Sequence, residues 1–129
     1  MRDSDTGMIR DLYAAFGRGD MDLVLKRLQD TEWHEAEGGP QGGVYTGPQE
    51  ILNGVFGPIM QQVPDFQVTP KEIIPAGDDR VLAIGNYTGR GDGGTLDARF
   101  AHLWTVADGG VTHFEQFADT ALLQRAVGQ

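Results

Sequence analysis

The sequence predicts an α+β fold in which helices come first and an antiparallel sheet follows. Apolar residues recur with helical spacing through most of residues 5–63, whereas they alternate over four consecutive stretches of residues 66–118. The length of 129 residues fits a single domain, 1–129. This order favours a strongly bent sheet wrapped around three helices.

The first two predicted helices form a helical hairpin. The apolar stripe of the first helix follows Asp5 and consists of Ile9, Leu12, Tyr13 and Phe16. The glycines in residues 17–20 end this helix, and Asp20 is a suitable N-cap for the next one. The stripe of the second helix consists of Met21, Val24, Leu25 and Leu28.

A short strand and a glycine-rich loop come next. Residues 33–37 alternate, which places Trp33 and Glu35 on the same face of a strand. Residues 38–47 predict a loop with a brief extended piece around Val44.

A third helix is predicted up to Val63. Thr46 and Gln49 have the spacing of a capping box, and a proline such as Pro48 is tolerated in a first helical turn. Pro58 should kink this helix, because it removes a backbone hydrogen bond.

Four strands and a last helix complete the prediction. The strands cover residues 66–74, 81–89, 96–106 and 111–118, and the helix covers residues 119–127 with Asp119 or Thr120 as its cap. Pro70 marks the first of these strands as an edge strand or the site of a bulge. Glycine-rich hairpins join the last three strands.

The strand of residues 96–106 carries the most informative pattern. Its even positions are apolar with the single exception of His102. Because alternate residues of a strand share a face, His102 should point into the interior with them.

Two turns are compatible with the hairpin that follows. A bulged turn with Gly109 in the left-handed region pairs His102 with Phe114, and a two-residue turn pairs His102 with Glu115. The bulged turn places inside Phe114, Gln116 and Ala118, and the two-residue turn places inside His113 and Phe117. The bulged turn is favoured because it buries one charged group fewer.

Aromatic side chains gather with Glu35 and His102 in this interior, which indicates a pocket. The expected substrate-binding residues are Tyr13, Trp33, Phe56, Phe100, Trp104, Phe114 and Gln116. The loop of residues 38–47 and the two glycine-rich hairpins should form its mouth. Two structural interpretations stay open: Glu35 half-exposed at the rim, and His102 a core residue bonded to a backbone carbonyl.

Charge and composition exclude several functions. Ten Lys and Arg against nineteen Asp and Glu give a net charge of −9, which disfavours nucleic acid and anionic membranes as partners. No apolar run is long enough to span a bilayer, and the N-terminus lacks a signal-peptide pattern, so we expect a cytoplasmic protein. Cysteine is absent and the three histidines lack metal-site spacing, so we expect neither a metal nor a cofactor.

Four segments carry a resemblance to a known family: residues 12–20, 30–35, 45–48 and 100–109. They resemble the SnoaL-like polyketide cyclases and ketosteroid-isomerase-related proteins of the nuclear transport factor 2-like superfamily. The resemblance implies a cone-shaped fold with an internal pocket and a homodimer through the outer sheet face. That face mixes apolar with polar residues, as interfaces do. The superfamily hosts many reactions on one scaffold.

The resemblance also implies roles for two residues. Glu35 falls where ketosteroid isomerase has its carboxylate base, and His102 falls near the acid that donates a hydrogen bond to the developing oxyanion. The family's first-helix tyrosine falls on Leu12, beside Tyr13. We therefore expect Glu35 and His102 to be catalytic, moving a proton on a hydrophobic carbonyl compound by isomerisation or aldol-type cyclisation. The alternatives are a non-catalytic binder of hydrophobic small molecules and a dehydratase or epoxide hydrolase.

Overall fold

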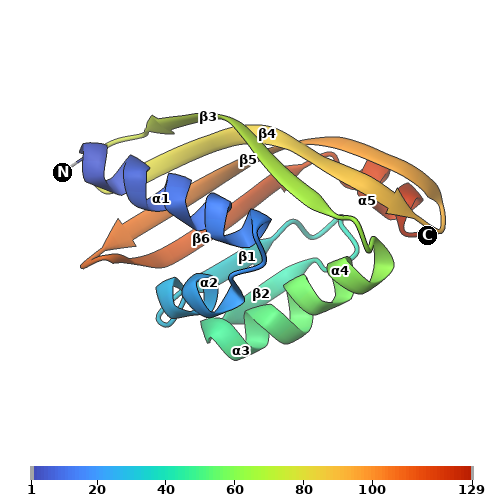
Figure 1. The fold of residues 1–129 in the computed structure, drawn as a ribbon, viewed down its shortest axis with the longest axis horizontal. Coiled ribbons are helices and arrows are strands. Elements are labelled where there is room, and N and C mark those ends of the chain that lie inside the picture. The colour runs from blue at the N-terminus through green and yellow to red at the C-terminus, as the bar shows by residue number, and fades with distance from the viewer. Residues whose placement is uncertain (1, 129) are drawn as a thin grey trace.

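A curved six-stranded sheet forms the frame of the molecule, and helices α1 to α4 lie on one side of it (Figure 1). The computed structural model describes residues 2–128. The strand order is β2-β1-β6-β5-β4-β3, and within it only the β1–β6 pair is parallel. The strands are β1 (Glu32–Glu35), β2 (Gly43–Thr46), β3 (Gln67–Pro75), β4 (Arg80–Gly91), β5 (Gly94–Ala107) and β6 (Gly110–Ala118). The predicted α+β fold is thus confirmed.

The helices form where the apolar stripes predict them. They are α1 (Arg2–Gly17), α2 (Met21–Arg27), α3 (Gly47–Ile51), α4 (Gly57–Gln62) and α5 (Thr120–Ala126). The carboxylates of Asp20 and Asp119 cap α2 and α5, each accepting a backbone N–H at 3.2 Å. None of the helices in residues 2–128 combines the length and the apolar character needed to cross a membrane.

The third helix differs from its prediction at its N-terminal cap and in how the chain accommodates Pro58. The Thr46 hydroxyl makes no capping hydrogen bond, so the capping box is wrong; instead the Thr46 N–H donates to Glu50 Oε1 at 2.9 Å. At the expected kink the structure has a π-helical segment, Leu52–Phe56, which ends two residues before Pro58. A widened turn accommodates the missing N–H of the proline.

The predicted irregularity at Pro70 is confirmed. Strand β3 is an edge strand, and its pairing with β4 shifts between Pro70 and Glu72. Such a bulge lets a residue without an N–H sit in a sheet.

The turn between β5 and β6 differs from the favoured prediction. Asp108 and Gly109 form a two-residue turn with φ values of 53° and 78°, and Ala107 pairs directly with Gly110. Positive φ at both positions is the signature of a type I′ hairpin turn.

A bulge in β6 then turns Phe114 and Gln116 inward, as predicted, although the turn itself is not the predicted one. Val106 pairs with Val111 but Thr105 pairs with His113, so Thr112 is one extra residue in β6. Because strand side chains alternate, this extra residue changes which β6 side chains face inward. Phe114 and Gln116 are buried as expected, but the predicted pairing of His102 with Phe114 is wrong: His102 pairs with Gln116.

Neither glycine-rich hairpin lies at the pocket mouth. The β4–β5 turn packs on helix α5, where the Gly93 N–H donates to the Ala126 carbonyl at 2.9 Å. The β5–β6 turn lies against α2, because Arg27 donates to the Gly109 carbonyl at 2.6 Å. Both hairpins therefore hold helices in place.

Candidate active site

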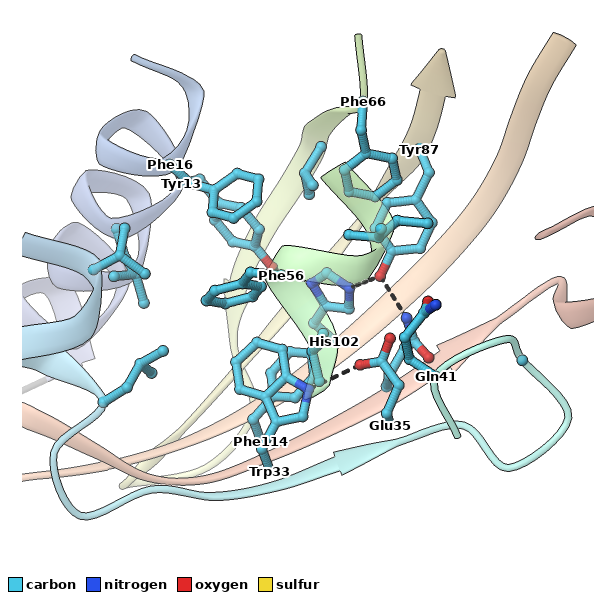
Figure 2. A pocket seen from close by; sticks show the side chains of 18 of the residues that line it. Tyr13, Phe16, Trp33, Glu35, Gln41, Phe56, Phe66, Tyr87, His102 and Phe114 are labelled. Atoms are coloured by element: carbon cyan, nitrogen blue, oxygen red, sulfur yellow. Dashed lines mark hydrogen bonds between the residues drawn. The ribbon is translucent and has the colours of Figure 1, made fainter. Parts of the chain in front are cut away.

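A cavity lies between the helices and the inner face of the sheet (Figure 2). Its volume is about 70 Å³, which is room for several waters or part of a small ligand. The aromatic residues that line it are Tyr13, Phe16, Trp33, Phe56, Phe66, Tyr87, Trp104 and Phe114, and the polar ones are Glu35, Gln41, His102 and Gln116. Among the lining residues of the described chain there is no lysine or arginine.

Strand β1 brings Trp33 and Glu35 to the same cavity wall. The Trp33 indole N–H donates to Glu35 Oε1 at 2.8 Å. The indole itself stacks on Phe114, with ring centroids 3.6 Å apart, across the parallel pair of β1 and β6. The carboxylate is therefore held by a ring that packing fixes in place.

The environment of Glu35 makes its carboxylate a suitable base. The side chain is half-buried, and loss of water around its carboxylate raises the pKa from 4.5 to about 7. Hydrogen bonds from Trp33 and Gln116 oppose this rise but are smaller. A base with a pKa near 7 is efficient at neutral pH.

His102 lies at the centre of a buried hydrogen-bond network. Tyr13 of α1 lies 2.5 Å from Nδ1 and Tyr87 of β4 lies 2.5 Å from Nε2, measured from each hydroxyl oxygen. The Tyr13 oxygen also accepts the Trp104 indole N–H at 3.0 Å, and the Tyr87 oxygen accepts from Gln116 Nε2 at 2.9 Å. Both ring nitrogens of His102 are thus already paired within the protein.

Burial keeps the His102 ring neutral. The residue is only 4% exposed, and desolvation lowers its pKa from 6.5 to about 3. Phe100 stacks on the ring with centroids 3.9 Å apart and an interplanar angle of 11°. At neutral pH the imidazole therefore carries one ring hydrogen and no charge.

Gln116 joins the carboxylate to this network. Its side-chain oxygen accepts the Ala36 N–H at 3.0 Å, and its nitrogen donates to Tyr87 and also forms a hydrogen bond with Glu35. The negative charge of Glu35 acts on Tyr87 as well, where it adds to the burial that raises the pKa of the hydroxyl. Glu35 and Tyr87 are consequently neighbours at one end of the cavity.

The structure brings together nearly all of the predicted site residues. Glu35, His102, Tyr13, Trp33, Phe56, Trp104, Phe114 and Gln116 line the cavity. Phe100 is the exception, because it is not among the lining residues and instead supports the ring of His102 from behind. The alternative of a backbone carbonyl as partner of His102 is not observed, since its partners are tyrosines.

The predicted site residues do not include Tyr87 or Gln41. Tyr87 lies on the inward face of β4 with Val81 and Ala83, so strand alternation alone could have found it. Gln41 belongs to the loop between β1 and β2, lines the cavity and donates to Gln62 of α4 at 2.9 Å. That loop is the one element of the predicted mouth that reaches the cavity.

The described residues offer no arrangement for a metal ion. Within residues 2–128 no three His, Asp or Glu side chains come close enough to form a ligand set. His34 and His113 lie outside the cavity near Glu32, with His34 Nε2 2.7 Å and His113 Nε2 4.0 Å from its carboxylate.

Comparisons with known proteins identify the family. The SnoaL-like domain matches residues 9–114. An NTF2-like protein from Burkholderia thailandensis has a similar solved structure, with a TM-score of 0.89 and 31% identity over 97% of this chain and 98% of that one. TerC, co-crystallised with polyporic acid, is similar with a TM-score of 0.84 and 27% identity over 97% of this chain and 98% of TerC. An uncharacterised protein of Mycobacterium tuberculosis is 29% identical over 121 residues, 92% of each chain. The chain therefore belongs to the SnoaL-like domain family and has the nuclear transport factor 2-like fold.

Proposed function

We propose that the cavity is the active site of a small cofactor-independent enzyme that moves a proton on a hydrophobic carbonyl compound. The observation that carries the proposal is the half-buried carboxylate of Glu35, whose pKa of about 7 suits a base, placed beside hydrogen-bond donors in an aromatic cavity. Glu35 is the base in this proposal, and the network centred on His102 stabilises the negative oxygen that forms.

The chemistry follows from these positions. Glu35 removes a proton from the carbon next to the carbonyl, the C–H electron pair moves into the new C–C double bond, and the carbonyl oxygen becomes negative. A hydroxyl of the network donates to that oxygen; one preorganised donor contributes about 3 kcal/mol to the lowering of the barrier. Where a C=C bond adjoins that carbon, the dienolate takes the proton back from Glu35 at the far end of the conjugated system, which is isomerisation. Otherwise the enolate attacks a second carbonyl of the same molecule, and the alkoxide that forms takes the proton from Glu35, which is cyclisation.

The lining supports an uncharged, largely aromatic substrate, of which the cavity holds one part. Its apolar rings gain free energy by leaving water and by stacking on the aromatic side chains of the wall. A carboxylate or phosphate ligand is disfavoured, since the described lining carries no cation and Glu35 is itself an acid. The co-crystallisation of the related TerC with polyporic acid agrees with an organic ligand in such a fold.

Deuterium exchange tests the proposal without knowledge of the natural substrate. We expect the protein to accelerate exchange of the hydrogens next to the carbonyl of 1-indanone in D₂O, measured by NMR. Glu35→Gln should lose this acceleration by about 10²-fold or more, because general-base catalysis typically contributes 10²–10⁴-fold. Equal exchange rates for the two proteins would contradict the role of Glu35.

Two further measurements separate the alternative functions. A thermal shift with 1-indanone but no exchange would favour a non-catalytic binding protein. Incorporation of ¹⁸O from labelled water into the diol formed from an epoxide, or into the alcohol formed from an alkene, would favour hydrolysis or hydration by the same residues.

We also propose a cytoplasmic homodimer that pairs through the outer sheet face. Ala101 and Phe117 are register partners there, and Phe117 is 50% exposed. A large exposed aromatic on a sheet suits an interface. Sedimentation at micromolar concentration should show a dimer that Phe117→Asp disrupts, and a 14.0 kDa species for the unmodified chain would contradict it.

A further inference from the structure

The three groups Tyr13, His102 and Tyr87 hold more hydrogens than they can use among themselves. Each tyrosine hydroxyl carries one hydrogen, since burial raises the pKa of both, and the neutral imidazole carries one. Within residues 2–128, two hydrogen bonds join the three groups, one at Nδ1 and one at Nε2 of His102. Each contact uses one hydrogen, so one hydroxyl hydrogen must be donated outside the group.

The surroundings of the two tyrosines decide which hydroxyl this is. The Tyr13 oxygen accepts the Trp104 indole N–H. Among the hydrogen bonds of the described residues, His102 Nδ1 is the only acceptor for the Tyr13 hydroxyl hydrogen. If Nδ1 carried the ring hydrogen, the Tyr13 hydrogen would be left without an acceptor among aromatic rings. A buried donor without a partner is costly.

Tyr87 has a different environment. Its oxygen accepts from Gln116, and it can accept the His102 hydrogen as well, because a hydroxyl oxygen has two lone pairs. The hydroxyl belongs to a residue that lines the cavity together with Glu35, and the negative charge of Glu35 acts on it, so a hydroxyl hydrogen that His102 does not accept is available to the cavity. Figure 2 shows Tyr87, Gln41 and Glu35 around the same part of the cavity.

We propose that His102 carries its hydrogen on Nε2 and is a positioning residue, which leaves Tyr87 as the hydroxyl that donates to an oxygen atom of the ligand. Tyr13 donates to Nδ1 of His102 and accepts from the Trp104 indole, so its hydroxyl is not available to the ligand. The ligand part rests on the proposed function, whereas the position of the ring hydrogen does not. It follows that the ligand oxygen lies at the Glu35 end of the cavity, beside β4, and not against α1.

The position of the ring hydrogen can be measured directly. Long-range ¹H–¹⁵N correlation spectra of the full-length ¹⁵N-labelled protein at pH 8 distinguish the two neutral tautomers, and His34→Gln and His113→Gln assign the other two rings. We expect the pattern of a neutral ring with hydrogen on Nε2, unchanged in Tyr13→Phe, where the acceptor Tyr87 remains. A hydrogen on Nδ1, or a doubly protonated ring, would overturn the proposal.

A pair of ligands tests the donor. We expect 1-indanone to bind at least about 10-fold more weakly to Tyr87→Phe, with the hydrocarbon indane unaffected, because a lost hydrogen bond to the ketone oxygen is worth about one factor of ten. Tyr13→Phe should keep the preference for the ketone. Loss of the preference in Tyr13→Phe but not in Tyr87→Phe, or no binding of either ligand, would overturn the role of Tyr87. Failure of deuterium exchange alone would reject the proposed enzymatic function, but it would leave valid the tests of the ring hydrogen and of the ligand preference.

Discussion

The indole N–H of Trp33 donates to the carboxylate of Glu35 at 2.8 Å, across a single intervening residue of strand β1. The two side chains meet because residues two apart in a strand share a face. The bond occupies Oε1 and favours the ionised carboxylate, in opposition to the loss of water that raises its pKa. Trp33 therefore adjusts the strength of the base as well as lining the cavity.

Trp33→Phe should raise the pKa of Glu35 further. The ring still packs on Phe114, but the donor to the ionised carboxylate is lost. A hydrogen bond to a charged group is worth about 1.5–3 kcal/mol, so the midpoint of the exchange-rate profile should move upward from about 7 by about one to two pH units. Rates of 1-indanone exchange between pH 5 and 10 measure the midpoint, and an unchanged midpoint would mean that the indole has no effect on the base.

Glu35→Gln should stabilise the fold at alkaline pH. The folded pKa of about 7 exceeds the ordinary 4.5, so the folded chain holds a proton more tightly and its stability falls as pH rises from 4.5 through 7. Glutamine removes this penalty, which is at most about 3 kcal/mol and smaller for a half-buried group.

Urea unfolding at pH 5 and pH 8 measures the difference. We expect the free energy of unfolding of Glu35→Gln, relative to that of the unmodified protein, to be higher at pH 8 than at pH 5. Glu37→Gln, two residues further along and exposed, is the matched control and should show no such gain. A Glu35→Gln gain no larger than that of the control would contradict a half-buried, desolvated carboxylate.

His102 should make the protein less stable in acid, whereas Glu35 makes it less stable at alkaline pH. Its folded pKa of about 3 lies below the ordinary 6.5, so the unfolded chain binds the proton first and stability falls as pH drops from 6.5 toward 3. At pH 5 this loss is about 2 kcal/mol.

The free energies of unfolding of His102→Gln and His113→Gln at pH 7 and pH 5 separate the acid sensitivity caused by His102 from that of other groups. His102→Gln should be less stable at pH 7 but should lose less on acidification. His113→Gln should keep the loss, because it retains His102. Identical acid sensitivity of the two variants would show that the buried ring is not its source.

Gly93→Ala should loosen the contact between the β4–β5 hairpin and helix α5. A Cβ at Gly93 would lie 1.6 Å from the carbonyl oxygen of Arg125, so the helix must move. The expected cost is about 1–3 kcal/mol, and the cavity should change too, since Leu123 of α5 lines it. Gly7→Ala, in open space on α1, should instead stabilise by about 0.5–1 kcal/mol; a melting curve for each variant compares them.

Local patterns predicted much of this fold. The caps Asp20 and Asp119 depend on neighbouring residues only, and the inward position of His102 depends on strand alternation. Both are visible in a short stretch of sequence, and both are confirmed. The placement of Trp33 and Glu35 together follows from the same alternation.

Other features depend on contacts that no local pattern contains. The bulge at Thr112 changed the partner of His102, although the turn chemistry of Asp108 and Gly109 was readable in the sequence. The tyrosine partners of His102 come from positions 89 and 15 residues away. Their meeting depends on how α1 and β4 pack, so the network became visible only in three dimensions.

The titration of the Glu35 carboxyl group tests the central claim most directly. In ¹³C-labelled protein the side-chain carboxyl signal, assigned by its absence in Glu35→Gln, can be followed from pH 3 to pH 10. We predict a midpoint near 7, as burial in the aromatic cavity requires. A midpoint near 4.5 would mean that water reaches the carboxylate freely, and it would contradict Glu35 as a base in a desolvated site.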